Sequence, residues 1–159
     1  MRERPLEQVM AEFFAADRRD LNTSIPGFIE SYDPETKTAQ VKIPFSDYQE
    51  TGGKNLTNQD WAPIPDVPVV FPRGGGWAIT WPLEKGDPVL VIFSQREIDQ
   101  WFPTDGQTDV SPQLLTTHNE SDAICIPGLF PQGNLTGEAN ATDLIMSHSD
   151  GDVLMRFEP

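Results

Sequence analysis

The sequence predicts a mainly β fold with a small barrel of five strands at its centre. Proline and glycine are frequent, at 15 and 12 of the 159 residues, and hydrophobic residues make up only 37%. Short apolar stretches recur between turn signals, most densely in residues 67–101. This combination is typical of short strands joined by turns. The length of the chain suits one domain with a single hydrophobic core.

Two strands are expected first, in residues 25–32 and 38–43. The turn between them is Asp33-Pro34-Glu35-Thr36, whose residue types favour a change of chain direction. Apolar and polar residues alternate in the second strand, so one of its faces is expected to be buried. Its apolar residues are Ala39, Val41 and Ile43. The polar stretch 44–65 is expected to be a long loop.

Three further strands are expected in residues 67–71, 77–81 and 89–93. Three consecutive glycines, residues 74–76, separate the first two of these strands. Residues 89–93 are apolar throughout, which is typical of a strand buried on both faces. Five short strands at this spacing predict a barrel of the OB type, closed or half-closed. The following stretch, residues 102–138, is expected to be irregular.

The first segment, residues 1–22, is expected to form a helix. Pro5 suits the first helical position, and Arg18 and Arg19 suit the last turn. Apolar residues recur in this segment at intervals of three and four. They are Leu6, Val9, Met10, Phe13 and Phe14. These side chains are expected to pack either on the barrel or on a neighbouring subunit.

The end of the chain predicts two short strands, residues 143–148 and 152–157, around Ser149-Asp150-Gly151. Asp-Gly is a strong hairpin signal. Because an isolated pair of short strands is marginally stable in water, the pair needs a partner, and copies of itself in an oligomer are the simplest choice. The expected contact residues are Leu144, Met146, Val153, Met155 and Phe157.

The net charge is -14, and residues 97–159 carry eleven acidic residues and one basic residue. This charge excludes a nucleic-acid binder, which needs a basic surface. A single cysteine, Cys125, excludes an intramolecular disulfide framework. No stretch reaches the length of apolar residues that a membrane-spanning helix needs, and the N-terminus lacks the features of a secretory signal. Synthesis in a cytoplasm is therefore expected.

No group of residues predicts catalysis, so the chain is expected not to be an enzyme. His118 and Cys125 lie close together in one loop, whereas a Cys–His site normally draws its members from distant segments. The glycines at 74–76 lack the Lys-Ser/Thr and the helix that a phosphate-binding loop requires. Acidic pairs such as Asp99 and Asp105 are expected by chance among twenty-five carboxylates.

His148 is the one candidate metal ligand. In a trimer, three copies of this histidine would meet on the axis, and imidazole suits transition metals. One histidine per chain gives a trimer only three ligands. A second histidine, two residues away, would be needed to give six. No cofactor is therefore expected, with iron at a trimer apex as the alternative.

Four tryptophans, Trp61, Trp77, Trp81 and Trp101, could stack on bases or sugars. The charge argues against bases, and the barrel core or a subunit interface is the more common place for tryptophan. A carbohydrate-binding OB-fold module, with Trp77 and Trp81 as its platform, is the alternative function.

Several motifs, in their order along about residues 22–130, resemble the N-terminal OB-fold domain of central spike proteins from contractile phage baseplates and tailocin-like particles. The similar stretches are Thr23-Ser24-Ile25-Pro26-Gly27, residues 32–41, Asp66-Val67-Pro68-Val69, residues 74–83, 86–94 and 96–101, and His118 with residues 122–128. The resemblance implies three parts: an N-terminal helix (1–22), an OB-fold domain (23–130) and a short spike segment (131–159).

The resemblance also implies a homotrimer in the virion, on the axis of the tail and below the hub protein, assembled in the bacterial host cytoplasm. The OB domains would form a collar, and the chain would continue into a trimeric β-prism that punctures the host outer membrane. The N-terminal apolar residues would then contact a subunit or the hub. The role would be mechanical, with the family motif residues structural. These are Arg96, Asp99, Trp101, His118 and Asp122.

The sequence departs from this family at its end. After Thr142, only one or two strand passes of a β-prism remain. Many relatives bind iron at the apex through a His-x-His pair, and this chain has only His148 there. We therefore expect a separate small tip protein to cap the trimer below Phe157.

Overall fold

The computed structural model describes residues 5–8, 10, 11, 14, 21–51, 55–111, 113, 114, 116–135, 137, 139, 141–148, 150 and 153–157. The chain divides into two compact units, Met1–Gly128 and Leu129–Pro159. Within the described residues the fold is mainly β, as the sequence predicts. No helix in this part of the chain combines the length and the hydropathy needed to span a membrane.

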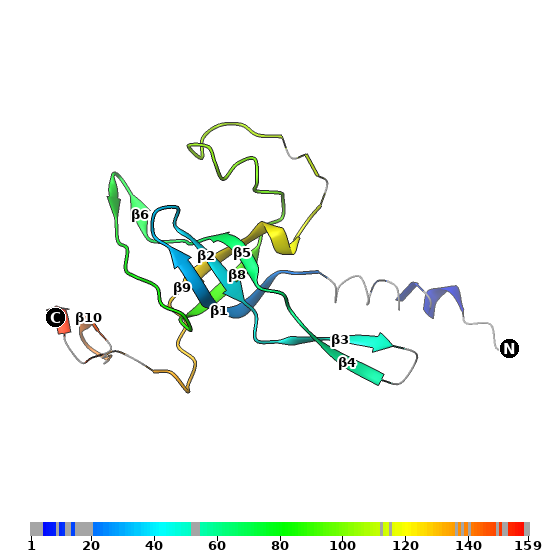
Figure 1. The fold of residues 1–159 in the computed structure, drawn as a ribbon, viewed down its shortest axis with the longest axis horizontal. Coiled ribbons are helices and arrows are strands. Elements are labelled where there is room, and N and C mark those ends of the chain that lie inside the picture. Colours follow the sequence, from blue (N-terminus) through cyan, green and yellow to red (C-terminus); the bar gives the residue numbers. More distant parts are fainter. Residues whose placement is uncertain are drawn as a thin grey trace. The chain divides into compact units, whose positions relative to one another are not determined.

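The first unit is built on one antiparallel sheet of five strands (Figure 1). In the order in which they lie side by side, these are β5 (Ile64–Pro68), β2 (Thr38–Lys42), β1 (Ser24–Asp33), β8 (Pro88–Phe93) and β9 (Ala123–Pro127). The predicted hairpin of the first two strands is confirmed. In its turn, Oδ1 of Asp33 accepts a hydrogen bond from the N–H of Glu35 at 2.8 Å, which fixes the change of direction.

The sheet curls into a half-barrel. Its pairing shifts register after Ile29 in β1 and after Ala39 in β2, and such bulges bend a strand and increase its twist. Beyond the end of β5, Val69 forms a parallel bridge with Cys125 of β9. The N–H of Val70 donates to the carbonyl oxygen of Cys125 at 2.9 Å. The two outer strands of the sheet therefore approach each other.

The predicted assignment of barrel strands is wrong for residues 77–81. Only Trp77–Ala78 is a strand there (β7), and it pairs with Arg73–Gly74 (β6) in a separate hairpin. The fifth barrel strand is instead β9, in the stretch that the sequence predicts to be irregular. The side chains of Trp77, Ile79 and Trp81, which would form the inner face of such a strand, are all exposed. In contrast, β9 has buried positions at Ala123 and Cys125.

The prediction of a loop over 44–65 is also wrong. Strands β3 (Ser46–Thr51) and β4 (Asn55–Asp60) form a regular antiparallel hairpin, which is fastened at its base by a 3.0 Å hydrogen bond from Oγ of Ser46 to Asp60. Polarity indicates exposure to solvent and does not exclude a ladder of backbone hydrogen bonds. Because apolar and polar residues do not alternate in this stretch, the sequence pattern did not predict the hairpin.

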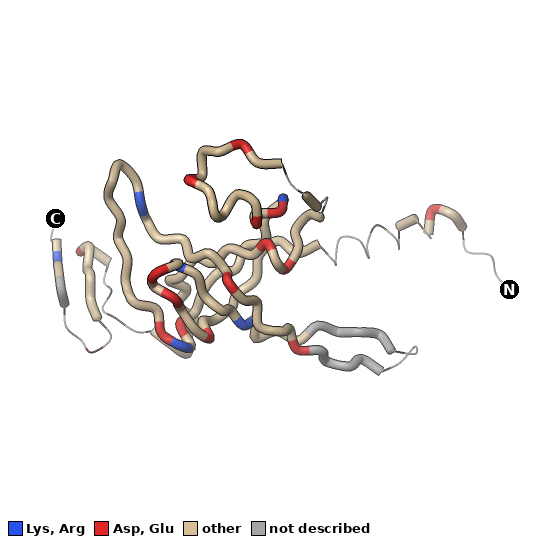
Figure 2. Tube along the Cα trace, turned by 45° about the horizontal axis from the view of Figure 1, so that its top comes forward, with Lys and Arg blue, Asp and Glu red and all other residues tan. Residues whose placement is uncertain are grey.

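The second unit contains one hairpin, β10 (Leu144–Ser147) with β11 (Val153–Phe157), close to the predicted bounds. At the other end of the chain, residues 6–8, 10, 11 and 14 are helical, as expected, and the N–H of Gln8 donates to the carbonyl of Pro5 at 2.9 Å. The rest of the predicted helix lies outside the described residues. Acidic positions outnumber basic ones along the described chain (Figure 2).

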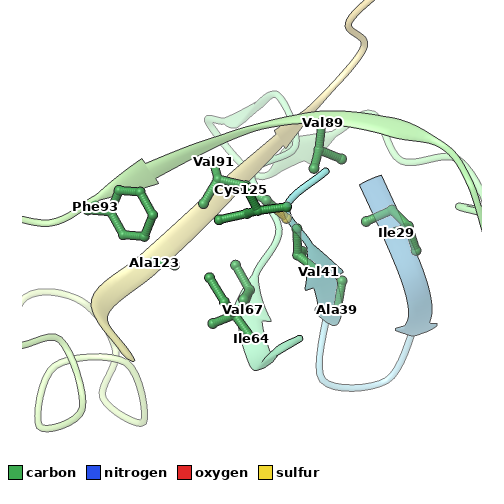
Figure 3. Packing of buried hydrophobic residues seen from close by; sticks show 11 residues of the cluster. Ile29, Ala39, Val41, Ile64, Val67, Val89, Val91, Phe93, Ala123 and Cys125 are labelled. Atoms are coloured by element: carbon green, nitrogen blue, oxygen red, sulfur yellow. The ribbon is translucent and has the colours of Figure 1, made fainter. Parts of the chain in front are cut away.

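The core lies on the concave side of the sheet. Branched aliphatic side chains and Cys125 from all five strands point towards one another there (Figure 3). The largest side chains that are fully buried are Ile29, Val41, Val67, Val89, Val91, Asp122 and Cys125. Gly27 completes the packing, because a Cβ atom at this position would lie only 3.0 Å from methyl carbons of Val41 and Val91. Burial of this cluster is the main source of stability of the sheet.

Candidate interaction surfaces

A short arm, residues 72–81, extends from the sheet (Figure 1). It doubles back at Gly75 and Gly76, whose φ angles of 57° and 85° are those that glycine adopts without strain. Its last backbone hydrogen bond joins the N–H of Ile79 to the carbonyl of Pro72 at 3.0 Å. The tip presents Trp77, whose side chain is 84% exposed. A tryptophan this exposed is unusual and marks a candidate contact site.

The base of the arm is held on the sheet by aromatic contacts. Phe71 is buried, and its ring meets the ring of Trp81 edge-on at 5.0 Å between centroids. Tyr32 of β1 packs against Phe71 at 6.3 Å, also edge-on. Both are favourable geometries for aromatic pairs. The arm is therefore anchored at its base and exposed at its tip.

A groove of about 540 Å³ runs along β2 and β5 on the first unit. We call it the acidic groove, and its lining includes Tyr32, Asp33, Gln40, Asp66 and Phe102. Burial raises the pKa of Tyr32, and the negative charge of Asp33 raises it further. Sequence reasoning missed this groove, because no spacing signal links the turn at Asp33 with Asp66 and with a loop residue such as Phe102.

Two of the family motif residues, His118 and Asp122, hold the long loop between β8 and β9 at the end of β8. Asp122 is buried at the end of the short helix η1 (Glu120–Asp122), and its Oδ1 accepts a hydrogen bond from the N–H of Ile98 at 3.0 Å. The N–H of Ser94 donates to the carbonyl of Asp122 at 2.9 Å, and that of His118 to the carbonyl of Ser94 at 3.0 Å. Nε1 of Trp101 donates to the backbone of the same loop. These contacts suit a structural role.

The C-terminal hairpin exposes an apolar face. Leu144 pairs with Phe157 and Met146 with Met155, so four predicted contact residues share one side of the two strands. All four are exposed. The fifth, Val153, lies in β11, and its side chain is outside the described part of the chain.

The N-terminal helix exposes a similar stripe. Leu6, Met10 and Phe14 recur every four residues and are all exposed. Val9 and Phe13, the other two predicted contact residues of this segment, lie outside the described residues.

The sequence of the first unit matches a known protein family. Residues 25–128, more than half of the chain, match the family described as phage protein Gp138 N-terminal domain. The chain belongs to this family. The expected resemblance to a phage protein is thereby confirmed, and a structural role in a phage particle follows. No curated protein matches the chain.

The Gp138 N-terminal domain of this chain spans β1 to β9, and therefore includes the arm, the acidic groove and the loop held by Asp122. The apolar face of β10 and β11 lies beyond the matched residues. Among the described residues, the exposed apolar stripe of the helix also lies outside the match. Each end of the Gp138 domain thus continues into a segment with exposed apolar side chains.

Beyond the Gp138 domain, His148 is held in the turn of the C-terminal hairpin. Its Nδ1 lies 3.3 Å from both the N–H and Oδ2 of Asp150. Nε2 is the nitrogen that would face a metal. No cluster of metal-ligating side chains occurs in the described residues of a single chain. The expectation of no metal stays a prediction, with an axial site shared by three copies as its alternative.

Within the Gp138 domain, Cys125 is the candidate nucleophile. The thiol is fully buried among core residues of the sheet, and this burial raises its pKa from 9.0 to about 12. A thiol in this state is neutral at physiological pH and a poor nucleophile. Cys125 is therefore a core residue.

Proposed function

We propose that this chain is a homotrimeric central-spike component of a contractile tail baseplate. Its first unit would form the collar, and its second unit would begin the β-prism that leads towards the membrane-puncturing tip. Membership of the Gp138 N-terminal domain family supports a role in a phage particle. The protein acts mechanically in this proposal, without catalysis and without a cofactor.

The strand arrangement supports assignment of the half-barrel to the OB type. An OB fold is a five-stranded, partly open Greek-key barrel. Here β1 lies at the centre of the sheet, and β8 crosses over to pair with its free side. The parallel bridge between Val69 and Cys125 then brings the third and fifth strands of the barrel together. This order and this bridge support the assignment to an OB barrel.

The observation that carries the proposal is the apolar face of the C-terminal hairpin. A two-stranded hairpin is marginally stable alone in water, and this one exposes Leu144, Met146, Met155 and Phe157 on one side. Three copies packed about an axis would bury these side chains against one another. The free edges of the strands would also find partners, which removes an aggregation hazard.

The two ends of the chain suggest the other partners. The exposed stripe of Leu6, Met10 and Phe14 suits a contact with a neighbouring subunit or with the hub protein. A separate tip protein would cap the trimer below Phe157, which is exposed on the apolar face of β10 and β11. The tip would then meet the host outer membrane.

The experiment is a mass measurement of the purified chain by sedimentation equilibrium or light scattering. The proposal expects a particle of three times 17.8 kDa. A clean monomer at micromolar concentration would overturn it. Cryo-EM of the trimer then tests the tip: a closed, sharp apex without a second polypeptide removes the need for a tip protein.

The alternative, a carbohydrate-binding module with Trp77 and Trp81 as its platform, has less support. Trp81 packs edge-on against Phe71 at the base of the arm, and Trp77 alone is fully presented at the tip. The two rings therefore have different surroundings. No observation favours them as one flat surface for a sugar ring.

A further inference from the structure

Two surfaces of the Gp138 domain carry opposite charges, and one projects while the other is hollow. One is the tip of the arm, a projection that carries Trp77 and the cation Arg73. The other is the acidic groove, a depression with aromatic walls and two carboxylates. They occur on the same chain, so they can meet only if one copy presents its arm to another or if the arm folds back. The 84% exposure of Trp77 shows that the arm does not occupy its own groove.

The arm has the chemistry of an interface anchor. Tryptophan and arginine are the residues most often found to dominate binding energy at protein interfaces. Arg73 is exposed, and it has no ion pair within the described part of the chain, whereas Lys85 pairs with Glu30 at 2.6 Å. Arg73 is also the one basic residue of the arm in a chain of net charge -14, so its preferred partner is acidic (Figure 2).

The acidic groove has the chemistry of the matching receptor. Its aromatic walls are Tyr32 and Phe102, and its carboxylates belong to Asp33 and Asp66. Among the described residues that line it, none is basic. No lining side chain therefore competes with the cation of a partner for the two carboxylates. Asp33 is engaged by the backbone of its own turn, whereas the Asp66 side chain forms no hydrogen bond with the described residues. Asp66 is therefore the carboxylate available to a partner.

We propose that the arm of one copy inserts into the acidic groove of the next copy. Trp77 packs on Tyr32 and Phe102 of the neighbour, and Arg73 pairs with Asp66 of the neighbour. The contact is head-to-tail, because two different patches meet, and such contacts close into rings when the rotation between copies allows it. This inference rests on the proposed homotrimer and assigns the residues that join its collar.

The test is a charge exchange in the full chain. R73E and D66K each place like charges opposite each other, and each is expected to weaken the trimer about tenfold or more. The double variant R73E/D66K restores the opposite pair in reversed order and is expected to recover most of the affinity. Lysine suits position 66, whose φ of 53° is close to the 57° that Lys37 adopts in this chain. W77A is expected to weaken the trimer, and the charge exchange at positions 73 and 66 is not expected to restore it.

The readout is the trimer fraction across a dilution series by sedimentation, in urea if the wild-type trimer does not dissociate on dilution. K42E and D109K, which change charges outside the arm and the groove, serve as matched controls and are expected to leave the trimer unchanged. Circular dichroism verifies that each variant is folded. If a reversal variant unfolds, R73Q, D66N and their combination replace it, and non-additive effects of the two changes then report the contact.

The outcomes separate the two proposals. A monomeric wild type overturns the homotrimer and this contact together. A trimeric wild type that R73E and W77A leave intact overturns the contact alone, as does a loss in both single variants without recovery in the double variant. Weakening by each single change with recovery in the double variant supports the insertion of the arm.

Discussion

At the scale of single residues, close packing in the core depends on positions where no side chain can be added. At Gly27, methyl carbons of Val41 and Val91 lie 3.0 Å from where a Cβ would stand, which is closer than van der Waals contact, and the carbonyl oxygen of Lys42 lies 3.1 Å away. The backbone of β1 thus passes unusually close to β2 and β8. This close approach is what a glycine in a strand interior commonly indicates.

Gly27→Ala is expected to destabilise the fold by about 1–3 kcal/mol, because β1 must move away from its neighbours to admit the methyl group. The measurement is the midpoint of urea unfolding. Gly74→Ala is the matched control, since a Cβ there meets nothing within 4 Å. Equal midpoints for the two variants would contradict the packing argument.

Cys125 is expected to resist thiol reagents in the folded protein. Raising the pKa from 9.0 to about 12 leaves roughly a thousandfold less thiolate near neutral pH. Because the folded pKa lies above the unfolded one, the stabilising contribution is complete below pH 9 and is lost as the pH rises towards 12. Reaction with a chromogenic disulfide is expected only after denaturant is added. Fast labelling of the folded protein would place the thiol at the surface.

At the scale of elements, three of the described hairpins differ in the kind of residues they carry. β1 and β2 carry the core, β3 and β4 are polar, and β10 and β11 expose an apolar face. A hairpin can therefore form with or without alternating apolar residues. The alternation determines whether one face of the hairpin needs to be buried against other residues. The hairpin that lacks cover within its own unit is the one that the proposed trimer would bury.

Met155→Asp is expected to lower the trimer affinity at least about tenfold, because it places a charge on the face where three hairpins would meet. The readout is the trimer fraction by light scattering across a dilution series. Leu135→Asp, a matched change at a side chain that is 69% exposed outside the hairpin, is expected to leave the trimer intact. If both variants behave as the wild type, the hairpin face is not an interface.

At the scale of the whole molecule, the chain combines a folded Gp138 domain with flanking segments that carry exposed apolar residues. The core cluster lies wholly within Met1–Gly128. The charge is concentrated towards the other end, where residues 97–159 have a net charge of -10. Stability therefore depends on the first unit, whereas the proposed trimer would use the flanking segments together with the arm and the groove.

A chain ending at Gly128 is expected to keep a cooperative thermal transition, because it retains every residue of the core cluster. The same truncation is expected to weaken the trimer, because it removes the hairpin face. Calorimetry and light scattering measure the two effects on one sample. Loss of the cooperative transition would mean that the second unit contributes to folding of the first.

The sequence by itself determined the mainly β class, the first hairpin, the C-terminal hairpin and the family, because alternation, turn residues and motif order are local signals. Tertiary structure alone decided which stretch completes the barrel: β9 is the fifth strand, and Trp77 lies on an arm. Only the tertiary fold placed Tyr32 of β1, Asp66 of β5 and the loop residue Phe102 around one groove. Contacts between residues far apart in the chain depend on strand order and bulges, which no short stretch encodes.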